Sequence, residues 1–294
     1  MKTLFILLLF CAATLHAQLP SSIAISGTAS TKVYALTQTF SDEFNGPLSL
    51  YDPKTGLGTW KTWYYWGGQT SSSGRVEKVV SCIFSDSGYN GVNPFSVAGG
   101  VLTIQANNNP NYPAKSKMPF TSGVITTEKS FSQLYGYFEI RCKTSPMAAG
   151  IWPAFWMLST TQQATEELDI MEDFAIPNFV SSTIHYLHAP TFSRGHAAKT
   201  ADTTAWHTYG MLWLPDEIYF YRDREQTWSL PNPGFHDAEY LIACLQTGAD
   251  GCFLGSPSPA SIPANMAIDY IRAYQVTPAP VPVASVSPTP GATP

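Results

Sequence analysis

The chain has 294 residues, of which 44% are apolar and 13% aromatic, enough to bury a sizeable core. Charged residues make up only 13%, whereas soluble domains average roughly a quarter. The net charge is −5 and no basic run is present, so nucleic acid is excluded as an expected partner. Few charges and many aromatic rings suit a neutral, ring-shaped ligand, but they suit an aromatic-rich β core equally well.

The first 17 residues have the pattern of a secretory signal peptide. A short positive start precedes the apolar run LFILLLFCAATL, and the small residue Ala17 stands where cleavage is expected. The run is shorter than the roughly 20 residues that span a bilayer, so no membrane span is expected. Cys11 suggests a lipoprotein signal as an alternative, but the bulky Phe10 before it argues against cleavage there. We therefore predict a secreted protein, extracellular or periplasmic, that begins near Gln18.

After this leader, short strand-like runs alternate with turn residues, and long helical patterns are absent. In residues 135–144, Phe138 and Ile140 alternate with Glu139 and Arg141, which predicts one buried and one polar face. The pattern predicts an all-β protein, an antiparallel β-sandwich or barrel. The expected strands are residues 100–106, 122–131, 135–144, 152–158, 168–174, 181–188, 207–214, 217–223, 239–246 and 266–276.

Two segments lack the strand pattern. Residues 61–98 include GGQTSSSG and SDSGYNGVNP, which are typical of loops. Residues 277–294, TPAPVPVASVSPTPGATP, hold many of the 23 prolines and predict a semi-extended linker or tether. We therefore expect one domain over residues 18–276, between the leader and the Pro-rich tail.

Four cysteines follow the leader, at positions 82, 142, 244 and 252. They include no C-x-x-C pair, so a zinc site built on cysteines is not expected. Export permits disulfides, and Cys244 and Cys252 flank the Gly-rich stretch LQTGADG, which favours a bridge between them. Cys142 lies on a predicted strand face and is expected to be an inert buried thiol.

Three acids interrupt an apolar run in EELDIMEDF, residues 166–174. Side chains alternate along a strand, so Glu167 and Asp169 share one face, but Glu172 falls on the other. A β-bulge around Ile170–Met171 would return Glu172 to the acidic face. A helix would scatter the three acids around its axis. The spacing therefore predicts a bulged strand.

An acidic trio of this kind can perform acid–base and nucleophilic chemistry. The outer glutamates could lean to within about 5–5.5 Å, the carboxyl separation of retaining glycosidases. Mutual repulsion would keep a proton on one acid near neutral pH, which places a general acid beside an ionised nucleophile. The same spacing also fits a solvated acidic face or a calcium site, and spacing alone does not choose between them.

The surroundings of the acidic strand resemble a known enzyme family. EELDIMEDF resembles the active-site strand of glycoside hydrolase family 16, the jelly-roll group of laminarinases, lichenases, agarases and carrageenases. The resemblance covers about residues 40–276 and implies a jelly-roll sandwich with a concave substrate cleft. Further blocks that resemble the family, in its order, are FSDEFNG (40–46), TSGVITTEKSFSQLYGYFEIRCK (121–143), GIWPAFWML (150–158), STIHY (182–186), WHTYGMLWLPDEIYFYRD (206–223) and IDYIRAYQ (268–275).

By this resemblance, Glu167 is the nucleophile, Glu172 the general acid/base and Asp169 the assisting acid between them. The implied mechanism is double displacement with retention of configuration. This chemistry requires no cofactor.

Five further side chains are candidates for substrate contact. Trp152 and Trp156 share a strand face beside the acids and could stack on sugar rings, although burial in the core is the alternative. The resemblance implies that Glu139, Arg141 and His185 also contact substrate. For Glu139 and Arg141 the alternative is a surface ion pair.

The resemblance also implies a structural calcium ion on the convex side, far from catalysis. Asp269 resembles its side-chain ligand, helped by Glu43 and a backbone carbonyl near Gly99–Gly100. The alternative is an exposed strand aspartate. His207 in WHTYG is expected to be a structural histidine.

Together these observations predict a secreted, monomeric, retaining endo-β-glycanase that hydrolyses β-1,3 or mixed β-1,3/1,4 glucan. Alternatives are a transglycosylase, a glycanase for another β-linked polysaccharide such as galactan or exopolysaccharide, and a non-catalytic glycan-binding jelly roll. Cys244 and Thr247-Gly248 stand where many family members carry an asparagine and a Gly-Gly turn. This departure and residues 61–98 leave the substrate preference open.

Overall fold

The computed structural model describes residues 19–26, 32–66, 80–86, 92–114, 116–176, 179–188, 190–199 and 202–279. The predicted signal peptide and residues 280–294 of the predicted tail lie outside the described residues. The last described strand runs to Ala279, so residues 277–279 of the predicted tail belong to the fold. Within the described residues there is no helix long and apolar enough to cross a membrane.

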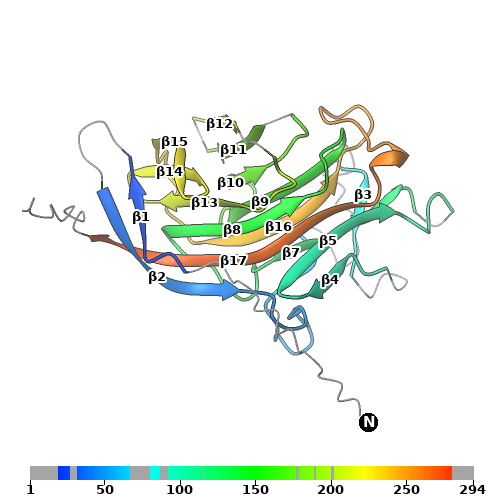
Figure 1. Ribbon diagram of the computed structural model, residues 1–294, viewed down its shortest axis with the longest axis horizontal. Coiled ribbons are helices and arrows are strands. Elements are labelled where there is room, and N and C mark those ends of the chain that lie inside the picture. Colours follow the sequence, from blue (N-terminus) through cyan, green and yellow to red (C-terminus); the bar gives the residue numbers. More distant parts are fainter. Residues whose placement is uncertain are drawn as a thin grey trace, which may run out of the picture.

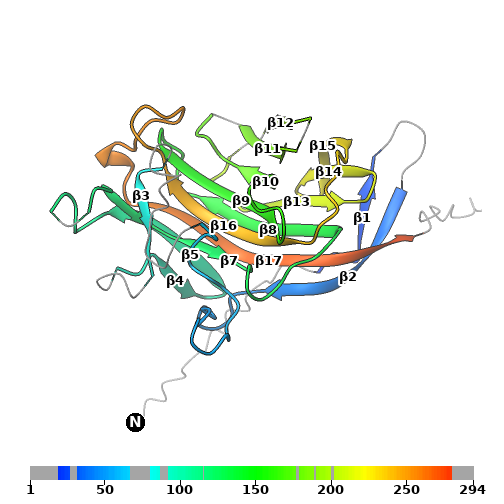
Figure 2. The same ribbon diagram turned by 180° about the vertical axis from the view of Figure 1, so that it is seen from behind.

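The described chain forms a sandwich of two largely antiparallel sheets, which confirms the predicted all-β class (Figures 1 and 2). The larger sheet follows the order β15-β14-β13-β8-β17-β5-β6-β3, with β1 paired to β2, β2 to β17 and β4 to β5. Its strands are β1 (Ser22–Ile25), β2 (Lys32–Asp42), β3 (Cys82–Phe84), β4 (Phe95–Ala98), β5 (Val101–Asn108), β6 (Phe120–Ser122), β8 (Gly136–Thr144), β13 (His207–Trp213), β14 (Glu217–Arg222), β15 (Glu225–Pro231) and β17 (Ala264–Ala279).

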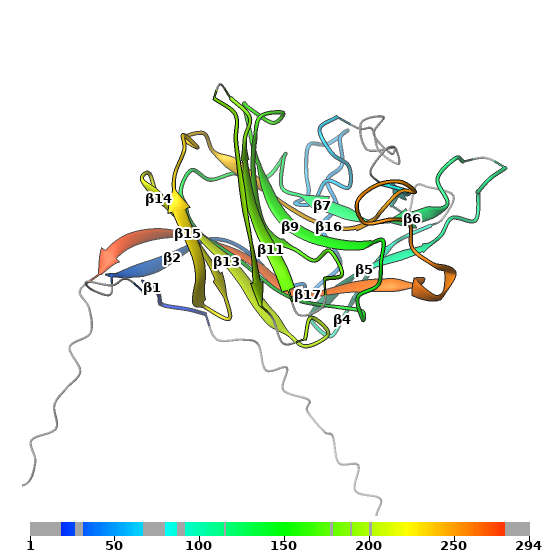
Figure 3. The same ribbon diagram turned by 90° about the horizontal axis from the view of Figure 1, so that it is seen from above.

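The smaller sheet, here called the cleft sheet, follows the order β12-β11-β10-β9-β16-β7. Its strands are β7 (Val124–Thr126), β9 (Ile151–Ser159), β10 (Glu166–Glu172), β11 (Phe179–Tyr186), β12 (Phe192–Lys199) and β16 (Glu239–Thr247). Strands β9 and β11 are long and strongly curved when the molecule is seen from above (Figure 3). The two sheets pack face to face, with β16 against β5 and β10 against β13.

Side-chain alternation along β16 shows that the cleft sheet is packed on both of its faces. Leu241, Ala243 and Leu245 belong to the main core between the sheets. Ile242 and Cys244 point the other way, into a second apolar cluster on the outer face. Both faces of this strand are therefore buried, one by the opposite sheet and the other by chain that folds over the cleft sheet.

The covering chain comes from the segment that the sequence predicts to be a loop. Within residues 61–98, Tyr64, Val80 and Phe84 are buried in the second cluster, and β3 and β4 form short strands. The loop prediction is therefore wrong for these parts of the segment. A three-residue strand such as β3 is too short to show an alternating pattern in the sequence.

Candidate active site

The acids lie on β10, and this strand contains the predicted bulge. Asp169 pairs with Trp156 of β9, and Met171 pairs with the next residue, Phe155. Ile170 is thus an extra residue relative to β9, and the register against β11 shifts at the same place. The bulge re-aims the last acid of the strand, as the spacing of the sequence predicts.

The bulge separates the side chains of β10 into two sets. Leu168, Ile170 and Met171 are buried in the core between the sheets. The three acids all line one pocket on the outer face of the cleft sheet. Two consecutive apolar residues, 170 and 171, therefore face the core so that acids on both sides of them can face the cleft.

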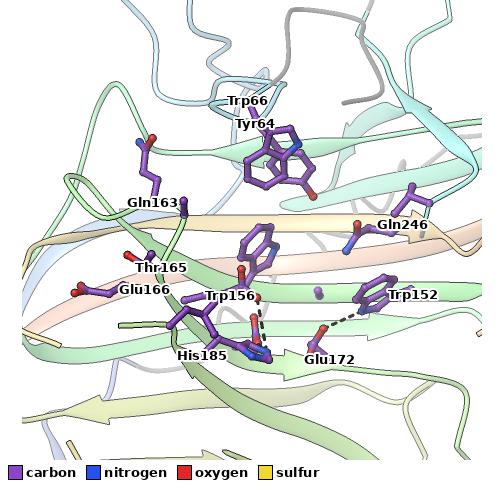
Figure 4. Close-up of a pocket in the computed structure, with 16 residues that line it drawn as sticks. Tyr64, Trp66, Trp152, Trp156, Gln163, Thr165, Glu166, Glu172, His185 and Gln246 are labelled. Carbon is purple, nitrogen blue, oxygen red and sulfur yellow. Dashed lines mark hydrogen bonds and ion pairs between the residues drawn. The ribbon is translucent and has the colours of Figure 1, made fainter. Parts of the chain in front are cut away.

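His185 joins two of the acids. It stands on β11 directly opposite Glu167 in the register. Its Nε2 lies 3.3 Å from Asp169 Oδ2 and 3.9 Å from Glu167 Oε1. On the other side of the ring, Nδ1 lies 2.8 Å from the hydroxyl oxygen of Ser193 on β12. His185 lines the pocket (Figure 4), and its contact with substrate stays a prediction.

Glu172 has a different partner at the other end of the trio. The indole N–H of Trp152 on β9 donates a hydrogen bond to Glu172 Oε1 over 3.0 Å (Figure 4). The side chain of Glu172 is 8% exposed, so this bond is made in a largely dehydrated environment. Trp152 therefore fixes the orientation of the carboxyl that the sequence assigns to acid–base chemistry.

Burial and like charges decide where the protons reside. Burial raises the pKa of Glu172 well above its ordinary value, and the charges of Asp169 and Glu167 raise it further, against the opposing effect of the Trp152 hydrogen bond. Burial and the charge of Glu167 likewise raise the pKa of Asp169. The side chain of Glu167 is 38% exposed. The arrangement therefore favours a proton on the buried acids beside an accessible carboxylate at Glu167.

Aromatic rings form much of the pocket around the acids. It has a volume of about 340 Å³, within the usual range for ligand sites. Trp152 and Trp156 both line it, and Trp156 is only 7% exposed. Stacking of either indole on a sugar stays a prediction.

Sequence reasoning missed several residues of the pocket wall, among them two aromatic residues and a glutamine. Tyr64 and Trp66 stack on each other with ring centroids 4.5 Å apart, and Tyr64 lies 5.6 Å from Trp156. Gln246 of β16 presents an amide to the same pocket (Figure 4). The dense aromatic run TWYYW at residues 62–66 was the available signal for the first two.

The sequence and fold of the chain match one family. A family model described as glycosyl hydrolases family 16 matches residues 89–240. Two endo-1,3-1,4-beta-glycanases of Rhizobium meliloti (strain 1021) are 35% and 36% identical to this chain over 256 aligned residues. The alignments cover 82% of this chain and 52% of each relative. The chain belongs to glycoside hydrolase family 16.

A solved structure of a family 16 enzyme supports the same assignment. The laminarinase catalytic domain from Thermotoga maritima MSB8 superimposes with a TM-score of 0.67 at 25% identity, covering 82% of this chain and 98% of that domain. The family resemblance and the jelly-roll fold predicted from the sequence are thereby confirmed. This family 16 chain spans about half the length of the two Rhizobium relatives.

Two predicted substrate contacts of this family 16 chain lie away from the cleft. Glu139 and Arg141 stand on β8, in the larger sheet. Glu139 is fully buried and accepts hydrogen bonds from the Arg224 guanidinium, at 3.0 Å each, and from two tyrosine hydroxyls. Arg141 pairs with Asp269 at 2.6 Å and lies over the ring of Trp206. Both substrate-contact predictions are therefore wrong, because alternation identifies a polar face but not the sheet to which it belongs.

The predicted calcium set is not assembled. The carboxylate of Asp269 receives the Arg141 guanidinium, while both oxygens of Glu43 accept hydrogen bonds from Arg272 at 2.8 and 2.7 Å. Gly100 lines a separate pocket to which neither acid contributes. The two carboxylates are thus paired with arginines in this structure. Calcium binding stays a prediction, which melting with and without a chelator would test.

The favoured disulfide is absent. All four described cysteines are free, and Cys244 lies in the middle of β16, paired with Ala154 of β9. Cys252 belongs to the following loop and lies 3.9 Å from the carbonyl of Gly255. The strand continues past Cys244 to Thr247, so the Gly-rich stretch does not fold back as the prediction requires. Cys142 is a buried free thiol, as predicted.

Proposed function

We propose that this chain hydrolyses internal β-1,3 or mixed β-1,3/1,4 linkages of glucans with retention of configuration. The observation that carries the proposal is the bulged strand β10, which directs three acids into one aromatic-walled cleft. The endo-1,3-1,4-beta-glycanases of Rhizobium meliloti and the laminarinase domain of Thermotoga maritima support glucan as the substrate class.

In the proposed mechanism, Glu172 and Glu167 act at one glycosidic bond. Glu172 gives its proton to the glycosidic oxygen while Glu167 attacks the anomeric carbon, which forms a covalent glycosyl–enzyme ester and releases the leaving chain. Glu172, now ionised, removes a proton from a water molecule while the water oxygen attacks the anomeric carbon. The ester bond to Glu167 then breaks and the sugar is released. Two inversions at the anomeric carbon give net retention.

The surroundings of the acids suit these roles. The proton must start on Glu172, and its burial beside Asp169 and Glu167 favours the protonated form. The attacking carboxylate must reach the substrate, and Glu167 is the most exposed of the three side chains. Asp169 lies between them, 3.3 Å from the His185 ring, and positions Glu167 without entering the reaction itself.

A polysaccharide panel tests the proposal. The full chain is incubated with laminarin, lichenan, curdlan, agarose, carrageenan and xyloglucan, and the products are sized over time. We expect rapid appearance of mid-length oligosaccharides from laminarin or lichenan, and anomeric proton NMR should show the β product first. Products longer than the oligosaccharides that are released first would instead indicate transglycosylation. Cleavage of agarose or carrageenan alone would overturn the glucan proposal.

Glu167→Ala and Glu225→Ala form a matched pair for this assay. Glu225 is an exposed acid at the turn into β15, outside the cleft. We expect turnover to fall by at least about 10³-fold in Glu167→Ala and to remain at the wild-type level in Glu225→Ala, with both variants folded by circular dichroism. Retention of more than a few per cent of turnover in Glu167→Ala would remove this residue from the nucleophile role.

Export and a monomeric state are part of the same proposal. Export is supported by the signal-peptide pattern of residues 1–17. Mass determination of the protein recovered from culture medium tests cleavage near Gln18, and light scattering of the purified protein tests the monomer. An uncleaved or retained protein would contradict export.

A further inference from the structure

Three side chains at the centre of the cleft each direct one metal-ligating atom to a common point. Glu167, Asp169 and His185 supply two carboxylate oxygens and one imidazole nitrogen, and all three atoms lie within 4.8 Å of one another. Among the described residues, no other group of three histidine, cysteine or acidic side chains meets this condition. The set contains a nitrogen donor, which distinguishes it from a simple cluster of acids.

The separations of the imidazole nitrogen from the two acids are close to what a tetrahedral ion requires. Zinc binds nitrogen and oxygen at about 2.0–2.2 Å, so two ligand atoms at the tetrahedral angle stand about 3.3–3.6 Å apart. Nε2 of His185 is 3.3 Å from the Asp169 oxygen and 3.9 Å from the Glu167 oxygen. Small rotations of the partly exposed His185 and Glu167 side chains would bring both separations into that range.

Ser193 supplies the outer support that a histidine ligand needs. Its hydroxyl oxygen lies 2.8 Å from Nδ1 of His185, on the ring edge opposite the acids. When Nδ1 carries the proton and donates it to this hydroxyl, the Nε2 lone pair is available to an ion on the side of the acids. This contact is independent of the acids themselves, because it comes from the neighbouring strand β12.

We propose that Glu167, Asp169 and His185 form a binding site for a zinc ion, which reversibly blocks the catalytic cleft. An imidazole with two carboxylates favours zinc over calcium or magnesium, which prefer sets made of oxygen only. The side chains of His185 and Glu167 are 34% and 38% exposed, so an ion can enter from solvent and keep a water molecule as its fourth ligand. The role of the ion as an inhibitor rests on the proposed function; its binding does not.

The physical basis of inhibition is competition for one carboxylate. An oxygen of Glu167 that coordinates zinc has its lone pair directed at the metal and cannot attack the anomeric carbon. The ion would also occupy the space above the acids that the sugar ring must enter. Glu172 lies outside the ligand set, so the block would act on the nucleophile and on substrate entry.

Calorimetry on the chelator-treated full chain measures zinc binding without reference to activity. We expect one zinc per chain in the wild type and binding at least about tenfold weaker in His185→Gln and Asp169→Asn. Ser193→Ala should weaken binding by roughly 10- to 100-fold, because it removes only the outer support of the histidine. Ser193 is exposed, so this variant should fold even if a substitution at a buried position does not.

His207→Gln is the matched control. His207 also faces a carboxylate, that of Asp223 at 2.7 Å, but it lies on β13 outside the cleft. We expect this variant to bind zinc like the wild type. Equal zinc affinity in wild type, His185→Gln and Ser193→Ala, or an equal loss in His207→Gln, would overturn the proposal.

Activity provides the second readout. Added zinc should reduce glucan cleavage by the wild type, and excess EDTA should restore it. Full cleavage at a zinc concentration that saturates the calorimetric site would overturn the inhibitory role. Absence of glucan cleavage without zinc would instead overturn the proposed function and leave the binding result standing.

Discussion

Glu239 on β16 is fully buried, and neither of its carboxylate oxygens has a hydrogen-bond partner among the described residues. Burial raises its pKa well above 4.5, and the negative charges of Glu166 and Glu167 raise it further. The folded protein therefore keeps Glu239 protonated over a pH range in which the unfolded chain would release the proton. A buried acid of this kind makes stability depend on pH.

Glu239→Gln should reduce this dependence. Because the folded pKa lies above the unfolded one, the contribution of neutral Glu239 is fully present below 4.5 and is lost as pH rises toward the folded pKa. We expect the variant to match the wild type near about pH 4 and to be more stable by about 1–3 kcal/mol near about pH 8. Urea unfolding at both pH values measures the difference in the free energy of unfolding between the variant and the wild type. A difference that is the same at both pH values would contradict the prediction.

Trp152→Phe tests the hydrogen bond to the general acid. The indole donates to Glu172 and lowers its pKa against the raising effect of burial. Loss of this bond should raise the pKa of Glu172 further. Catalysis needs the protonated acid, so the alkaline limb of the kcat/KM profile should move to higher pH. A limb that moves to lower pH would show that water entering beside the smaller ring outweighs the lost bond.

At the scale of elements, the bulge in β10 determines which residues reach the cleft. One extra residue, Ile170, lies between the pair Glu167 and Asp169 and the last acid, Glu172. With that residue removed, the strand alternates regularly and Glu172 still faces the cleft. With one more residue added and the one-residue bulge kept, Glu172 would point into the core between the sheets. Without a bulge, Glu172 would face the cleft but stand two residues farther along the strand from Glu167 than it does now.

A deletion and an insertion at this place should therefore differ sharply. Deletion of Ile170 removes a core side chain and should cost about 2–5 kcal/mol of stability, but it should leave measurable glucan cleavage. Insertion of one alanine after Ile170 should reduce turnover by at least about 10³-fold, because Glu172 then either points into the core or lies two residues farther along the strand from Glu167. Circular dichroism shows whether each variant is folded. Greater activity in the insertion variant would mean that the bulge does not orient Glu172.

At the scale of the whole molecule, packing without covalent cross-links holds the described sandwich together. The main core contains side chains from both sheets, and the second cluster attaches residues 64–66 and 80–84 to the outer face of the cleft sheet. The cysteines that contribute to these clusters, Cys142, Cys82 and Cys244, are buried and unbridged. Stability should therefore be insensitive to reducing agents.

Thiol counting tests this conclusion. We expect all four cysteines of the described chain to react with a thiol reagent after unfolding in denaturant without reductant. The melting temperature should be the same with and without reductant. A count lower by two, with a reductant-sensitive melting temperature, would show a bridge and contradict the free thiols.

The sequence pattern predicted the structure correctly where the question was which face of a single strand a side chain occupies. Glu167, Asp169 and Glu172 could be assigned to one face, and the bulge around Ile170–Met171 located, because alternation along one strand depends only on neighbours in the chain. The position of His185 was instead implied by the resemblance of the block STIHY to the family, and the structure places its ring 3.3 Å from Asp169. The fold class followed from many such short alternating runs.

The identity of each strand's neighbours was decided only by tertiary structure. Glu139 and Arg141 have the alternation of a cleft strand, yet β8 lies in the opposite sheet. Tyr64 and Trp66 are far from β10 in sequence, but their segment folds over the cleft sheet and completes the pocket wall. Side-chain alternation is a property of a few adjacent peptide units, whereas sheet membership depends on hydrogen bonds and packing between distant segments. The sequence by itself therefore determined which acids share a face of β10. Only the tertiary structure decided which residues surround those acids.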